Sequence, residues 1–139
     1  MSGNDFVKFF LRTPLHKFMG NTMLLTVTGH KTGRKYTTPV NYYREDGCLW
    51  VMTNRDRSWW RNLRNGAQVS LLIHGKTMDA RAQVEGEIPV EKNLAEYIRH
   101  IPVTARALGI RMEKNAPNAD DLSRLAKVRL FVKIEPFYN

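Results

Sequence analysis

The sequence TGHKTGR joins two apolar segments through a bend with unusual positive charge and two glycines. The side chains of Lys31, Thr32 and Arg34 bring two cations and a hydroxyl to it. Backbone N–H groups near Gly29 and Gly33 would complete a cradle for a phosphate or a carboxylate. The G-x-x-x-x-G-K-[ST] spacing of a P-loop is absent. The bend is therefore either an anion site or a solvated basic turn.

A second basic stretch, MTNRDRSWWRNLRNG, covers residues 52–66. On a helix that starts near Ser58, Arg57, Arg61 and Arg64 would share one face at spacings of four and three. Such a stripe beside indole rings can bind a polyanion that carries a flat ring.

The two tryptophans of this stretch, Trp59 and Trp60, are adjacent. A helix this short cannot easily present both rings to solvent, so we expect one indole in the core and one at a site. Gly66 follows where a left-handed residue would end the helix.

Other catalytic machinery is not visible in the sequence. The four histidines have no metal-ligand spacing and Cys48 is the single cysteine, so no metal site is expected. Hydrolase motifs such as G-x-S-x-G and H-E-x-x-H are missing. We therefore assign no catalytic side chain and expect any chemistry to come from a bound cofactor.

These residues must be positioned by a string of short strands. Period-two alternation and β-branched runs predict six strands, at residues 23–28, 36–43, 48–53, 69–73, 78–84 and 128–134. Helices are expected at SWWRNLRN, at residues 89–101 and after the capping pair Asn118 and Asp121. Pro39 interrupts the second strand, which marks an edge, a bulge or a turn toward a ligand.

Short turns between neighbouring strands favour antiparallel pairing over a doubly wound sheet. Closure into a barrel removes unpaired edges. The predicted fold class is mainly β with helices (α+β): a six-stranded antiparallel split β-barrel flanked by three or four helices.

Composition agrees with one folded domain. The chain has 139 residues, of which 42% are hydrophobic, and we expect a single domain over residues 1–139. Lys and Arg number 22 against 13 acidic residues, a net charge of +9, which would attract nucleic acid, anionic lipid or a small polyanion. The lone cysteine and the lack of a secretory signal or an apolar span predict a cytoplasmic protein.

The N-terminal segment, residues 1–20, is predicted to form an amphipathic helix with phenylalanines on one face and basic residues around it. Such a helix either covers the core or lies on a membrane surface as a peripheral contact.

The ordered motifs LLTVTGHKTGR, TTPV and WWRNL, between residues 24 and 63, resemble the deazaflavin-dependent nitroreductase and quinone reductase family. Members of that family are FMN-binding-like split β-barrel flavoproteins. The resemblance spans about residues 20–85. It implies a cofactor in a groove of the barrel, with its acidic tail on the basic bend.

The resemblance also implies site residues and a reaction. The cofactor would be reduced deazaflavin coenzyme F420, whose tail carries a phosphodiester and glutamates; FMN is the alternative. A hydride would pass to a small-molecule electron acceptor: a quinone, a nitroaromatic or an activated alkene. The cofactor-binding residues implied are Lys31, Thr32, Gly33 and Arg34 for the tail and Thr38, Pro39, Val40, Thr53, Asn54, Arg55 and Trp60 around the ring.

Other functions stay open at this point. They are an FMN-binding reductase, a carrier that binds its ligand without turnover, and a basic barrel that binds single-stranded nucleic acid. Nucleic acid is not the expected partner, because the basic residues gather at one bend and one helix rather than along a continuous groove. Both a monomer and a homodimer are compatible with the sequence.

Overall fold

A computed structural model describes residues 21–137 of the chain. The helix predicted within residues 1–20 lies outside the described residues. Within residues 21–137, no helix has the length and apolar character needed to cross a bilayer.

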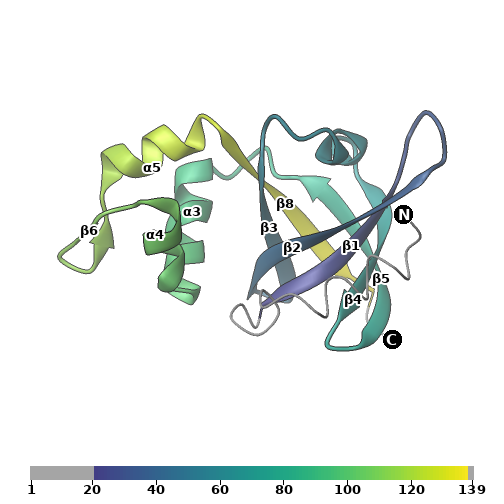
Figure 1. Cartoon of the computed structure of the whole chain (residues 1–139), viewed down its shortest axis with the longest axis horizontal. Helices are drawn as coiled ribbons and strands as arrows, with labels where there is room; N and C mark the ends of the chain where they lie inside the picture. Colours follow the sequence, from purple (N-terminus) through teal and green to yellow (C-terminus); the bar gives the residue numbers. More distant parts are fainter. Residues whose placement is uncertain (1–20, 138–139) are drawn as a thin grey trace.

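Six antiparallel strands form a closed barrel in the order β1-β2-β3-β8-β5-β4 (Figure 1). The predicted six-stranded antiparallel barrel is therefore confirmed. The strands are β1 (Thr22–Thr28), β2 (Lys35–Glu45), β3 (Cys48–Asn54), β4 (Ala67–Ile73), β5 (Lys76–Val84) and β8 (Arg129–Pro136).

Two-residue turns connect β2 to β3 and β4 to β5. Asp46 and Gly47 have φ values of 53° and 76°, and His74 and Gly75 have values of 49° and 78°. Positive φ at both central positions matches the right-handed twist of the flanking strands. The two hairpins predicted from the sequence are thus present, and each sets the register of its strand pair.

The inside of the barrel is filled by alternate residues of its strands. One cluster joins residues such as Leu25, Val51, Leu71 and Val132, each fully buried. Successive strand side chains point to opposite faces, so the period-two pattern of the sequence directs these residues inward.

Three α-helices pack against one side of the barrel (Figure 1). They are α3 (Val90–His100), α4 (Val103–Leu108) and α5 (Ala119–Ala126), and the short strands β6 (Met112–Glu113) and β7 (Ala116–Pro117) form a separate ribbon. The predicted helices at 89–101 and after Asn118 are confirmed, whereas α4 and the ribbon were not predicted.

The helices cover the outer face of β2, β3 and β8. A second cluster joins Tyr43, Trp50 and Phe131 of the barrel to Leu94 and Tyr97 of α3. The ring centroids of Tyr43 and Tyr97 lie 5.5 Å apart. The barrel wall between the two clusters is therefore buried on both faces.

The start of α5 is held by a buried carboxylate. Asn118 accepts the backbone N–H of Asp121 at 3.0 Å, as the capping pair predicted. The carboxylate of Asp121, 2% exposed, pairs with Arg111 at 3.0 Å and Arg124 at 2.8 Å. This network ties α5 to the segment that follows α4.

We predict that Asp121→Asn lowers stability in a pH-dependent way. Hydrogen bonds from Arg111 lower the pKa of Asp121 from 3.8 to about 2. Because the folded pKa is the lower one, the stabilisation is complete above the unfolded pKa and disappears as pH falls through the folded value. Urea unfolding across this range checks it: the gap between wild type and variant should close toward pH 2.

The exposed Asp120→Asn is the matched control, since it sits in the same helical turn. A gap for Asp121→Asn that stays constant from neutral to acid pH would contradict this role.

Candidate functional site

A cleft opens in the barrel wall between β2 and the end of β3. Its volume is about 330 Å³, within the range of about 300–1,000 Å³ that is usual for small-molecule sites. We call it the β2–β3 cleft; its lining residues are Tyr36, Thr38, Pro39, Val40, Asn41, Met52, Thr53, Asn54, Arg57, Trp59, Tyr97 and Arg129.

Incomplete pairing between the two strands produces this cleft. β2 pairs with β1 over residues 35–41 but with β3 only over residues 42–45. The rest of β3 pairs with β8 up to Asn54, opposite Arg129. β2 and β3 therefore diverge, and Pro39 lies in the part of β2 that has no second strand partner among the described residues.

The chemistry of the cleft is polar and positive. Arg57 and Arg129 line it, and none of the described lining residues is acidic. Amide and hydroxyl groups come from Asn41, Asn54 and Thr38. The cleft is suited to a ligand rich in acceptor oxygens or negative charge.

The basic bend differs from the predicted cradle in one respect. Its glycine N–H groups are not free: Gly29 donates to the carbonyl of Arg34 at 2.6 Å, and Gly33 donates to the carbonyl of Gly29 at 2.9 Å. The Arg34 N–H donates to the Thr32 hydroxyl at 3.3 Å. The turn itself satisfies the N–H groups of Gly29, Gly33 and Arg34, so these three are not the free donors that were expected near the glycines.

The bend is anchored to the short helix η1 (Trp59–Leu63), a 3-10 helix. The backbone N–H of His30 donates to Asn62 at 3.0 Å, and the Asn62 amide donates to the carbonyl of Trp59 at 3.2 Å. One side chain thus links the bend to the helix that carries the cleft indole.

One indole lies at the cleft and the other does not, as expected, but the cleft residue is Trp59 and not Trp60, which the resemblance implied. Both are buried, at 7% exposed for Trp59 and 8% for Trp60, but Trp59 lines the cleft and Trp60 does not. Trp60 instead packs beside Arg61 and Arg64, whose guanidinium carbons lie 5.6 and 5.2 Å from its ring centroid. Each such contact contributes about 0.5–1 kcal/mol at an exposed site.

Arg55 also differs from its expected place. Its guanidinium donates to the carbonyl of Ala126 at 3.2 Å and its backbone N–H donates to the carbonyl of Val128. It binds the end of α5, and the neighbouring Arg57 lines the cleft. Of the predicted ring-binding residues, the cleft brings together Thr38, Pro39, Val40, Thr53 and Asn54.

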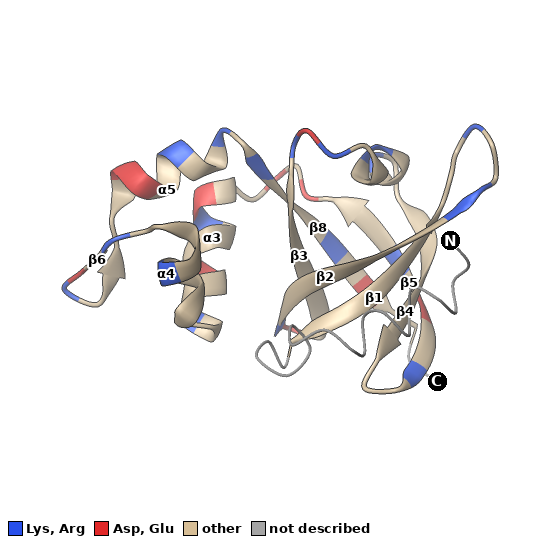
Figure 2. Cartoon of the chain, viewed as in Figure 1, with Lys and Arg blue, Asp and Glu red and all other residues tan. Residues whose placement is uncertain are grey.

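Basic segments gather at one end of the barrel. Figure 2 shows Lys and Arg in the bend, in the loop before η1, in η1 and at the start of β8, all on the end where the cleft opens. Lys31, Arg34, Arg57, Arg61 and Arg64 in these segments are all exposed. Their combined field attracts anions to the cleft mouth.

Of the lining residues that were not predicted as site residues, Tyr97 and Arg129 lie far in the sequence from those that were. Tyr97 belongs to the buried face of α3, and its helical spacing indicated only core packing. Arg129 begins β8 and reaches the cleft because β8 pairs with β3. Alternation with Phe131 places Arg129 on the outer face of β8, but the contact with β3 is not local in sequence.

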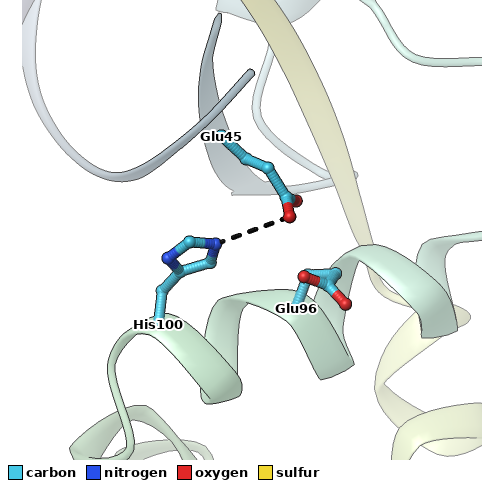
Figure 3. Close-up of side chains that lie close together, drawn as sticks. All are labelled: Glu45, Glu96 and His100. Carbon is cyan, nitrogen blue, oxygen red and sulfur yellow. Dashed lines mark ion pairs between the residues drawn. The ribbon is translucent and has the colours of Figure 1, made fainter. Parts of the chain in front are cut away.

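A second cluster of ionisable groups lies between the β2–β3 hairpin and α3, near a hollow of about 470 Å³ (Figure 3). Glu45, Glu96 and His100 place ligand atoms within 4.8 Å of one another. Arg99 already pairs with both carboxylates, with Nη2 at 3.0 Å from Glu45 and 2.7 Å from Glu96. Its hydrogen bond is the main reason that the pKa of Glu96 is lowered. The cluster joins α3 to the barrel.

Residues 11–114 match a family model described as F(420)H(2)-dependent quinone reductase. No curated protein matches the sequence. The match includes the bend, β2, β3 and η1, and it ends before α5 and β8.

Solved structures share the fold at low identity. A candidate pyridoxamine 5′-phosphate oxidase from Listeria innocua has a TM-score of 0.55 at 8% identity, over 97% of this chain and 93% of that one. The heme storage protein HutZ from Vibrio cholerae has 0.54 at 15%, over 100% and 93%. An FAD-binding protein from Mesorhizobium loti has 0.51 at 15%, over 99% and 90%. At these identities the likeness shows the split-barrel fold.

We predict that Asn62→Ala loosens the bend. It removes the acceptor of the His30 N–H and one hydrogen bond to η1, which should lower the free energy of unfolding by about 1 kcal/mol. Urea unfolding measures this. Asn65→Ala, an exposed asparagine just after η1, should change it by less than about 0.5 kcal/mol. Equal effects of the two substitutions would show that Asn62 has no special anchoring role.

Proposed function

The chain belongs to the F(420)H(2)-dependent quinone reductase family, and we propose that it reduces a quinone with coenzyme F420 bound in the β2–β3 cleft. Membership makes it an oxidoreductase that uses reduced F420. The acceptor class and the binding residues are the proposed part.

The charge of the cleft is the observation that supports this site. Two arginines and no acid line it, and the basic bend is anchored beside it through Asn62. A coenzyme with a flat ring and an acidic tail needs a narrow cleft for the ring and positively charged side chains near one end of it for the tail. The cleft and the basic bend provide these two features. The residues present therefore fit the group.

Separate parts of the site would hold separate parts of the coenzyme. Lys31, Thr32 and Arg34 would bind the acidic tail with exposed side chains, while Gly33, at a φ of 71°, keeps the bend compact. The β2 segment Thr38, Pro39 and Val40 would form the wall beside the ring. Thr53, Asn54 and Trp59 would lie on the opposite wall of the cleft.

When bound, the reduced deazaflavin supplies the hydride. The protein would contribute orientation and electrostatics, because no cysteine, histidine or carboxylate is among the described residues lining the cleft. The indole of Trp59 and the side chain of Met52 exclude water from part of the slot. A quinone suits it because its carbonyl oxygens can accept hydrogen bonds from the cleft amides and arginines.

Direct titration tests the assignment. Fluorescence of F420, and separately of FMN, is followed as purified coenzyme-free protein is added, and the protein with reduced F420 is then mixed with menadione. We expect micromolar or tighter binding of F420, weaker binding of FMN and oxidation of the coenzyme. Absence of F420 binding would contradict the proposed site.

We predict that Lys31→Ala weakens F420 binding about two- to fivefold at low salt. One exposed charge contact contributes up to about 1 kcal/mol, and salt screens it, so the difference should shrink at high ionic strength. Equilibrium titration at two salt concentrations measures this.

Lys76→Ala is the matched control. Lys76 is an equally exposed lysine at the start of β5, at the opposite end of the barrel (Figure 2). Equal weakening by both substitutions would point to net charge rather than to the bend.

A further inference from the structure

Arg129 occupies an unusual position in the cleft. It is the first residue of β8, opposite Asn54 of β3, and lines the cleft together with Met52 and Tyr97. It also lies beyond residues 11–114, the part that the family model matches.

One N–H group of the Arg129 guanidinium has no hydrogen-bond partner within residues 21–137. Its Nε is buried, with no hydrogen-bond partner among the described residues. No ion pair found within residues 21–137 involves it either. A buried donor without an acceptor costs about 1–3 kcal/mol, more when charged, so the site is built for an acceptor that a ligand brings.

The surroundings of Arg129 leave its charge uncompensated. Arg57 is the other charged residue of the described lining. The phenol of Tyr97 is buried, and burial raises its pKa, so this hydroxyl stays neutral. Met52 adds an apolar contact. An oxygen that gains negative charge beside Arg129 would meet an unopposed cation in a partly water-excluded wall.

We propose that Arg129 contacts the acceptor oxygen that becomes negative during reduction, and so selects acceptors that carry such an oxygen. This rests on the proposed function of the cleft. If the ring lies along the Thr38–Val40 wall, its other face is directed at the wall formed by β3, β8 and α3. The acceptor must stack on that face to receive a hydride, which places Arg129 beside the acceptor.

Hydride transfer to the quinone would create a negative charge, and Arg129 would stabilise this charge. In the proposed step, a C–H bond of the reduced coenzyme would break and the hydride with its electron pair would form an O–H bond at one quinone oxygen. The coenzyme would be left oxidised and the quinone would become a hydroquinone monoanion, with its charge on the other oxygen; this anion would later take a proton from water. Arg129 stabilises the monoanion and the transition state that leads to it.

A binding experiment without coenzyme tests the anion site. Calorimetry compares lawsone, a hydroxynaphthoquinone that is an anion at neutral pH, with menadione, its neutral methyl counterpart. We expect the wild type to bind lawsone about tenfold more tightly than menadione, a difference of about 1.4 kcal/mol. Arg129→Ala should abolish the preference, and Arg57→Ala should keep most of it. Loss of the preference in Arg57→Ala alone would overturn the proposal.

Steady-state kinetics with reduced F420 and menadione test the catalytic part. Arg129→Ala should lower kcat about 100-fold, as removal of a transition-state donor does, with the Kd of F420 changed less than about threefold. Arg106→Ala, an exposed arginine on α4, should leave both unchanged. If Arg129→Ala weakens F420 as much as it lowers kcat, Arg129 binds the coenzyme and the proposal is wrong.

Two further variants keep the proposal testable if Arg129→Ala does not fold. If Arg129→Ala unfolds, Arg129→Lys and Arg129→Gln replace it: the lysine should retain part of the lawsone preference and the glutamine should lose it. Equal behaviour of these two variants would overturn the proposal. A wild type that fails to bind F420 but prefers lawsone in an Arg129-dependent way would contradict the proposed function and leave the anion site standing.

Discussion

The divergence of β2 from β3 is the constraint on which the site depends. β3 pairs with β2 over only four residues, 42–45, and then follows β8, so the barrel wall opens beside Thr38 and Pro39. Proline cannot donate to a ladder and fits at such an opening. On the opposite wall, the same pairing of β3 with β8 brings Arg129 to the cleft. One pairing pattern therefore produces both the slot and the charge within it.

Electrostatics then make this slot different from other hollows of the molecule. The described lining of the cleft has two arginines and no acid, whereas Glu45 and Glu96 of the hollow beside α3 are paired with Arg99. The bend adds cations at the same end of the barrel, and Asn62 holds it beside η1 (Figure 2). The proposed binding mode uses this separation of a ring slot from a basic end.

Local signals in the sequence were enough for the six barrel strands, their two hairpins and the Asn118 cap, because alternation, the Asp46-Gly47 and His74-Gly75 turns and the cap act over a few residues. They did not predict features that depend on exact side-chain positions or on contacts between residues far apart in the sequence. Trp59 lines the cleft, whereas the resemblance implied Trp60. The guanidinium of Arg55 donates to a carbonyl at the end of α5, and Arg129 lies at the cleft because β8 pairs with β3 in the closed barrel. Such contacts join residues about 70 positions apart, and no local pattern records them.

The most direct test of the account is to compare F420 with its deazaflavin fragment that lacks the phosphodiester and glutamates, by equilibrium titration at low and high salt. If the cleft holds the ring and the basic end holds the tail, both should bind, F420 the more tightly, and added salt should reduce the difference. Equal affinities at low salt would show that the basic end makes no contact with the tail and would contradict the central claim.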